Sequence, residues 1–237
     1  VALLLLGACA AGVWLWADWS RFADATLAIR AQGQTVEIAR GMTFKEIVQA
    51  LRAQQVSAAP AWYWRALAAR MGVAGHLHAG EYALDPGLTP RMLLERMAAG
   101  RVLQHRLTIV EGWTFRQLRD ELRRADRLAH ATADLGGDEV MRRLGFAGEA
   151  PEGRFLPETY AYVKGDSDLD LLKRAHDAMD RYLATQWAQR DPAVPLQTPY
   201  QALVLASIVE KETGRGEERA EIAGVFERRL KLGMRLQ

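Results

Sequence analysis

Residues 202–214, ALVLASIVEKETG, place three consecutive charged side chains directly after an almost entirely apolar run. These are Glu210, Lys211 and Glu212, and a carboxylate beside apolar side chains is the kind of group that acts as a general acid or base. At 100° per residue on a helix, Glu210 lies on the face of Ser207, whereas Glu212 lies about 200° further round. The two carboxylates therefore do not form a pair, and Glu210 alone is the candidate proton donor.

Two features of its position favour proton donation by Glu210. The residue falls in the last turn of the predicted helix, where the negative end of the helix dipole disfavours an ionised carboxylate. Partial burial beside apolar side chains acts in the same direction, so the carboxyl group should hold a proton near neutral pH, as a general acid requires. In the alternative interpretation the helix ends at the surface, and Glu210 pairs with Lys211 or Arg215 without a catalytic role.

The helix that carries this carboxylate has clear predicted ends. Thr198 can cap it, and Pro199 suits its first position. Gln201 can complete a capping box, while Gly214 is a typical residue at the end of a helix. We therefore expect a helix that begins at about residue 199.

The region from about residue 125 onward is expected to be mostly helical. Residues 168–190 have apolar side chains at helical spacing, which predicts an amphipathic helix packed on a core. Residues 151–165, PEGRFLPETYAYVKG, contain proline and glycine and are rich in aromatic side chains, which favours extended chain.

One strand, turn and helix pattern occurs three times before that region. Each copy has Gly, any residue and Thr, then apolar residues at helical spacing, and the three threonines are Thr43, Thr89 and Thr114. Each threonine can cap the helix that follows, and a strand-like segment precedes each copy. With a further helix candidate at 60–72, residues 34–85 are predicted to run strand, helix, helix, strand. That order fits a plain α+β domain or a LysM-like carbohydrate-binding unit.

The first 17 residues carry no charge, and three tryptophans, Trp14, Trp16 and Trp19, lie at their end or just beyond it. An apolar run of this length with aromatic residues at its far end favours a transmembrane anchor over residues 1–19, and a basic cytoplasmic leader is expected before it. The alternatives are a cleaved signal peptide and a lipoprotein in which LGAC ends in a lipidated Cys9. The apolar run continues past Cys9, which favours the anchor, and in all three cases the rest of the chain leaves the cytoplasm.

Composition excludes several other classes of function. A net charge of +2 with interleaved acidic and basic residues offers no surface for nucleic acid. The single cysteine excludes an internal disulfide and a cysteine-based zinc site. The five histidines show no ligand spacing beyond His76 and His78, so we expect no metal.

The block LASIVEKETG, followed by ERAEIAGVFERRLKLGMRLQ, resembles the signature of the endolytic murein transglycosylases, the YceG-like or MltG family. Three earlier segments, AGEYAL, IVEGWTFRQL and EGRFLPETY, are similar to other blocks of that family, so the resemblance covers essentially the whole chain. It implies an α+β protein of three parts. These are a membrane anchor over residues 1–19, a LysM-like subdomain over 30–105 and a mostly helical α+β catalytic domain over 106–237.

The resemblance also implies a site and a substrate. The family's catalytic glutamate falls on Glu210, and Ser207, Glu158 and Tyr160 are weaker candidates for substrate binding. The implied protein is a single-pass protein of the cell inner membrane with its catalytic part in the periplasm. Its partners would be peptidoglycan glycan strands and, in addition, peptidoglycan synthases. Family members continue past MRLQ with a Thr-Asp-Pro segment of the active-site region, so residues beyond Gln237 are expected to complete the cleft.

In the implied reaction one carboxylate is enough, and no metal, nucleotide or redox cofactor is expected to take part. Glycosidases that use water need two carboxylates. A lytic transglycosylase cleaves the bond between N-acetylmuramic acid (MurNAc) and N-acetylglucosamine (GlcNAc) with the C6 hydroxyl of MurNAc as nucleophile, which leaves a 1,6-anhydro-MurNAc end. Two other functions remain open: a scaffold that binds glycan without cleaving it, and a hydrolase in which a further carboxylate activates water.

Overall fold

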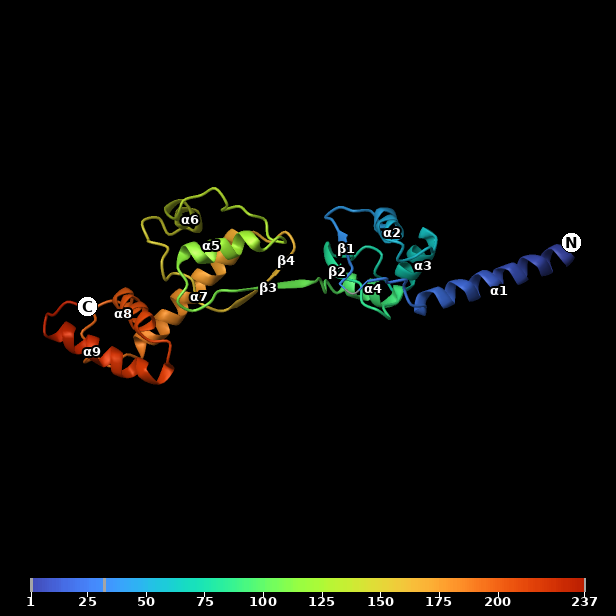
Figure 1. Cartoon of the computed structure of the whole chain (residues 1–237). Coiled ribbons are helices and arrows are strands. Elements are labelled where there is room, and N and C mark those ends of the chain that lie inside the picture. Colours follow the sequence, from blue (N-terminus) through green and yellow to red (C-terminus); the bar gives the residue numbers. More distant parts are fainter. Residues whose placement is uncertain (1, 32, 237) are drawn as a thin grey trace. The chain divides into compact units, whose positions relative to one another are not determined.

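The computed structural model describes residues 2–31 and 33–236 of the chain. The chain divides into two compact units, Val1–Gln104 and His105–Gln237, and each has a hydrophobic core of its own. Helices dominate both units; the strands β1 and β2 pair in the first unit, and β3 and β4 pair in the second (Figure 1). The predicted α+β class is confirmed. The side chain of Cys9, on which the lipoprotein interpretation depends, lies outside the described ones.

The first unit has the predicted alternation of strands and helices. Its elements are α1 (Ala2–Asp24), β1 (Thr35–Ile38), α2 (Phe44–Ala53), α3 (Ala61–Arg70), β2 (Gly80–Ala83) and α4 (Pro90–Ala98). The strands β1 and β2 pair antiparallel, with Thr35 opposite Ala83 and Ile38 opposite Gly80. The strand, helix, helix, strand order is therefore as expected, whereas the likeness to LysM stays a prediction.

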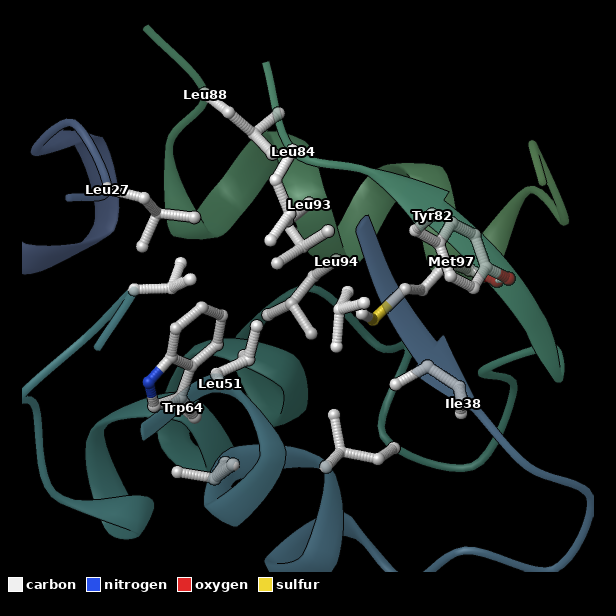
Figure 2. Packing of buried hydrophobic residues seen from close by; sticks show 14 of the residues in the cluster. Leu27, Ile38, Leu51, Trp64, Tyr82, Leu84, Leu88, Leu93, Leu94 and Met97 are labelled. Atoms are coloured by element: carbon white, nitrogen blue, oxygen red, sulfur yellow. Dashed lines mark hydrogen bonds between the residues drawn. The ribbon is translucent and has the colours of Figure 1, made fainter. Parts of the chain in front are cut away.

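The core of the first unit lies between its helices and the strand pair. Figure 2 shows Trp64 of α3 and Leu51 of α2 close to Leu94 of α4, and all three are at most 1% exposed. Helix α2 is fixed at its start by the predicted capping box, in which Thr43 Oγ1 and the Glu46 side chain each accept from the other residue's backbone N–H. The apolar stripe of α2 is thereby directed into the core.

A small hollow of about 170 Å³ lies at the surface of the first unit. It is formed by the loop between β1 and α2 together with the segment between α3 and β2, and Gly41, Phe44 and Ala74 are among its lining residues. Of these, Ala74 is exposed, so the hollow is open to solvent there.

Helix α1 joins the first unit through its C-terminal turns. Trp14 and Trp16 are exposed, whereas Trp19 packs against the core and its Nε1 donates to the carbonyl oxygen of Tyr63 at 3.2 Å. Over residues 2–31 and 33–236, no helix combines the length and the apolar character needed to cross a membrane. The anchor predicted for residues 1–19 is therefore not confirmed.

The second unit is the more helical of the two. Its elements are β3 (Gln104–Thr108), α5 (Phe115–Arg124), α6 (Gly137–Leu144), β4 (Thr159–Val163), α7 (Asp168–Ala188), α8 (Pro199–Glu212), the 3₁₀ turn η1 (Gly216–Glu218) and α9 (Arg219–Lys231). The strands β3 and β4 pair, and the hydroxyls of Thr108 and Thr159 lie 2.8 Å apart across them. The strand β4 and the helix α7 occupy the segments predicted to be extended and amphipathic.

Two apolar clusters hold the second unit together. The larger one joins α5, α6, α7 and the strand pair, and Leu171, Leu172 and Ala175 of α7 are fully buried in it. The smaller one packs Leu205 of α8 against Phe226 of α9. This second contact sets α9 beside α8, and the candidate site lies along that pair of helices.

Candidate active site

Local contacts at both ends determine where α8 begins and ends. Thr198 Oγ1 accepts from the backbone N–H of Gln201 at 3.2 Å, and Pro199 occupies the first turn, as predicted. The Gln201 side chain does not close the expected capping box, because its Oε1 accepts from the N–H of Gln197 at 2.6 Å instead. The helix ends at Glu212, just short of the predicted Gly214.

A tight turn brings α9 back against α8. Thr213 Oγ1 donates to Glu218 Oε2 at 2.8 Å and accepts from the N–H of Arg215 at 3.0 Å. The same Glu218 pairs with the Arg215 guanidinium at 2.8 Å. The turn thereby places Arg219, the first residue of α9, beside Glu210.

Glu210 lines a cleft of about 880 Å³ in the second unit. The walls come from α8, the start of α9, the last turns of α7, the loop between β3 and α5, and residues 151–157. The aromatic lining side chains are Trp113, Phe115, Phe155, Tyr182 and Tyr200, and the ionisable ones other than tyrosine are Glu111, Glu152, Glu210, Lys211 and Arg219. A cleft of this volume, apolar over most of its wall with a few convergent polar groups, is typical of a ligand-binding site.

The Glu210 carboxylate forms an ion pair with Arg219. Glu210 Oε2 lies 2.8 Å from Arg219 Nη2, and the Glu210 side chain is 30% exposed. The expectation of a protonated carboxyl group considered burial and the helix dipole and did not include this guanidinium. The non-catalytic alternative expected Lys211 or Arg215 as the partner, and neither has that position: Arg215 pairs with Glu218.

Lys211 instead joins α8 to the loop between β3 and α5. Its Nζ donates to the carbonyl oxygen of Gly112 at 2.8 Å. Gly112 has φ +74°, a left-handed conformation that favours glycine, and a Cβ there would lie 3.8 Å from Glu210 Cγ. The loop therefore runs directly against the carboxylate, and the next side chain after Gly112, Trp113, lines the same cleft.

The weaker predicted site residues differ in position. Ser207 lines the cleft with Glu210, and its hydroxyl donates to the carbonyl oxygen of Val204 at 2.7 Å, which leaves the oxygen free to accept. Glu158 is exposed beside β4 and Tyr160 is buried in the larger core, and neither is among the described residues that line the cleft.

Tyr160 lies in the larger apolar cluster of the second unit. Its hydroxyl donates to the carbonyl oxygen of Leu156 at 2.8 Å. Burial raises the pKa of Tyr160 to about 12, with a further contribution from the charge of Glu158.

Sequence reasoning missed three ionisable groups that line this cleft: Glu152, and the pair formed by Glu111 and Arg219. Arg219 lies on the far side of the turn after α8, and its Nη2 is also 3.6 Å from Glu111 Oε2 in the loop between β3 and α5. Both residues belong to blocks singled out for their resemblance, IVEGWTF and ERAEI. Nothing in the spacing of the sequence places Glu111 near Glu210.

Comparison with known proteins gives one family. The model of the YceG-like family matches residues 36–237. Among solved structures, the chain is similar to a yceG-like protein, lmo1499, from Listeria monocytogenes, with 25% identity over 87% of this chain and 73% of that one. The TM-score is 0.43, too low to carry the arrangement of that structure over to this chain. Curated proteins give no match.

Proposed function

This chain belongs to the YceG-like family, and from that membership we propose that it is an endolytic lytic transglycosylase with Glu210 as its acid and base. The family is related in general to murein transglycosylases, so the function is peptidoglycan-related in any case. The proposed reaction cleaves the bond between MurNAc and GlcNAc inside glycan strands and leaves 1,6-anhydro-MurNAc ends.

The observation that carries the proposal is the position of Glu210. Its carboxylate lines a cleft of about 880 Å³, within the usual volume for a bound ligand, and an arginine contacts it at 2.8 Å. The helical face that it shares with Ser207 is the face that lines the cleft. Glu212 is exposed and is not among the described lining residues, so it is outside the proposed chemistry.

The proposed mechanism uses Glu210 twice in one turnover. In the first step its proton passes to the oxygen between MurNAc C1 and GlcNAc, the bond from C1 to that oxygen breaks, and GlcNAc leaves with a hydroxyl group. In the second step the resulting carboxylate takes the proton of the MurNAc C6 hydroxyl while that oxygen bonds to C1. The carboxyl group is regenerated and no water is consumed.

The walls of the cleft suit a polysaccharide. Trp113, Tyr182 and Tyr200 present aromatic surface, and Tyr182 and Tyr200 are 53% and 47% exposed, so their exposed surface can lie against sugar rings. The Arg154 guanidinium lies over the Tyr200 ring, 5.0 Å from its centroid. The Ser207 oxygen can accept a hydrogen bond from a sugar hydroxyl. Glu158 and Tyr160 have no part in the proposal.

The end groups of the products test the proposal. Purified glycan strands are incubated with the full-length protein, and the new ends are identified by mass spectrometry before and after borohydride reduction. We expect ends that are lighter than reducing ends by one water and that borohydride does not reduce. Release of long internal fragments early in the reaction is expected of endolytic cleavage, whereas reducing ends would exclude transglycosylation.

A hydrolase is the second candidate, because the cleft contains another carboxylate. Since Arg219 Nη2 lies 2.8 Å from Glu210 Oε2 and 3.6 Å from Glu111 Oε2, the two oxygens are at most about 6.4 Å apart, and hydrolytic glycosidases hold theirs about 5 to 9.5 Å apart. Reducing ends in the same product analysis would favour this candidate. Strands that are bound but left intact would favour a scaffold.

A further inference from the structure

Arg154 contacts one of the aromatic side chains of the cleft. Its guanidinium carbon lies 5.0 Å from the centroid of the Tyr200 ring, in the first turn of α8. Tyr200 lines the cleft and is 47% exposed, whereas the Arg154 side chain is 16% exposed and is not among the described lining residues. The guanidinium therefore contacts the ring from outside the cleft, and the exposed part of the ring stays open to a ligand.

A carboxylate holds the Arg154 guanidinium in place. Arg154 Nη2 lies 2.9 Å from Glu149 Oε2, and both residues belong to the segment between α6 and β4. The backbone N–H of Glu149 donates to the carbonyl oxygen of Phe146 at 3.2 Å, and the Phe146 ring stacks on the fully buried ring of His176 with centroids 3.7 Å apart. The arginine is thus tied to the packed interior of the second unit.

The contact with Tyr200 also gives a buried part of Arg154 its partner. Arg154 Nε is buried and has no hydrogen-bond acceptor among the residues that the structure describes. A buried N–H without an acceptor costs free energy, and the negative face of an aromatic ring offsets part of that cost because it attracts a cation. The pair therefore favours one orientation of the Tyr200 ring.

The backbone on both sides of this pair is fixed by other contacts. A Cβ at Gly153 would lie 3.6 Å from Leu203 Cδ2, so residues 151–157 run directly against α8. Leu203 follows Tyr200 by three positions, so the two contacts fall on neighbouring turns of one helix face. The freedom that is left to the platform formed by Tyr200 is the rotation of its own side chain.

We propose that Arg154 is a positioning residue that holds the Tyr200 ring in the orientation in which it stacks on a sugar ring of the glycan strand. The inference deepens the function proposed above and rests on it. A ring that is already held loses less side-chain freedom when the sugar binds, so the strand binds more tightly. Tyr200 and Glu210 are ten residues apart on α8, about 15 Å along the helix axis, so the ring contacts the strand away from the bond that breaks.

The steady-state constants of cleavage test the inference. The full-length protein is assayed on purified glycan strands. Arg154→Met keeps an unbranched side chain but removes the cation, so KM should rise about fivefold while kcat stays within about twofold. Tyr200→Ala removes the ring and should raise KM about tenfold. Tyr200→Phe keeps the ring and should keep the wild-type KM.

A double-mutant cycle separates positioning from a general structural role. Arg154 is proposed to act through the ring, so Arg154→Met combined with Tyr200→Ala should have the KM of Tyr200→Ala alone. If the two side chains acted independently, their effects on KM would multiply. Arg154→Lys keeps a cation near the ring and should restore most of the wild-type KM.

Arg190 supplies the matched control. Its guanidinium carbon lies 3.8 Å from the centroid of the Trp187 ring, and neither residue is among the described ones that line the cleft. Arg190→Met removes a cation from an aromatic ring in the same way and should leave KM unchanged. Arg154→Gln is a second neutral replacement in case Arg154→Met folds poorly, and native folding of each variant is checked by circular dichroism.

Three results would overturn the positioning role: a wild-type KM in the folded neutral variants of Arg154, multiplied effects on KM in the double variant, or an equal rise of KM in Arg190→Met. Failure of the proposed function is distinguishable, because it appears in the products of the wild-type protein. Reducing ends would refute transglycosylation and leave the comparison of KM values intact, whereas uncleaved strands would refute both proposals.

Discussion

The contact between α8 and the loop at residues 110–114 depends on one long side chain, that of Lys211. Lys211→Met keeps an unbranched chain of similar reach but removes the donor to the carbonyl oxygen of Gly112. A hydrogen bond with a charged partner contributes about 1.5–3 kcal/mol when it is protected from water. Lys211 is exposed, so water replaces part of the lost interaction, and we expect a loss of about 1 kcal/mol.

Hydrogen exchange measures this loss at the loop itself. The backbone N–H of Trp113 donates to the carbonyl oxygen of Val110 at 3.3 Å, so its exchange reports opening of the loop. Since 1.4 kcal/mol corresponds to a factor of ten, a loss of about 1 kcal/mol should speed exchange at this amide about fivefold. The exchange is followed by mass spectrometry of the peptide that contains the loop.

A lysine elsewhere on the surface supplies the control. Lys231 is the exposed last residue of α9, and Lys231→Met should leave exchange in the loop unchanged. Unchanged exchange in Lys211→Met as well would refute the reasoning, because the loop would then be held in place without the lysine.

Three further predictions concern other parts of the chain. The pKa of Tyr160 is raised to about 12 in the folded state, so the folded protein holds the phenolic proton more tightly than the unfolded chain does. The stability that this bound proton contributes is complete below about pH 10 and is lost as the pH rises towards about 12. Between about pH 8 and about pH 11, the urea concentration at the midpoint of unfolding should therefore fall less for Tyr160→Phe than for the wild type. An equal fall in both proteins would contradict this. If the hollow of the first unit binds glycan, Ala74→Glu should weaken retention of the full-length protein on glycan strands, and unchanged retention would leave the LysM-like prediction without support. If residues 1–19 anchor the protein, protease added outside spheroplasts should degrade the rest of it, and Cys9→Ala should stay in the membrane fraction; protection from protease would contradict the first expectation, and release of the variant would favour the lipoprotein interpretation.

Local signals in the sequence were sufficient for much of the secondary structure. The threonines Thr43, Thr89 and Thr114 each cap a helix, as predicted. These caps could be predicted because a capping contact joins residues only three positions apart. The face of α8 that carries Glu210 could also be predicted, since the period of a helix fixes which side chains share a face.

Contacts between distant segments could not be predicted in the same way. The pairing of Arg219 with both Glu111 and Glu210 depends on the turn after α8 and on the path of the loop between β3 and α5. That loop is far from Arg219 in the sequence. The burial of Tyr160 could have been predicted from the sequence. Tyr160 and Tyr162 are two positions apart on β4, so they share one face of the strand, which here is the buried face.

The most direct test of the proposed function is the rate of glycan cleavage by Glu210→Gln in the full-length protein. The amide keeps the shape of the side chain but can neither donate the first proton nor accept the second, so the rate should fall by about two to four orders of magnitude while the fold is retained. Glu212→Gln, on another face of α8, should keep most of the activity. A folded Glu210→Gln protein that still cleaves glycan strands at close to the wild-type rate would contradict the assignment of Glu210 as the acid and base.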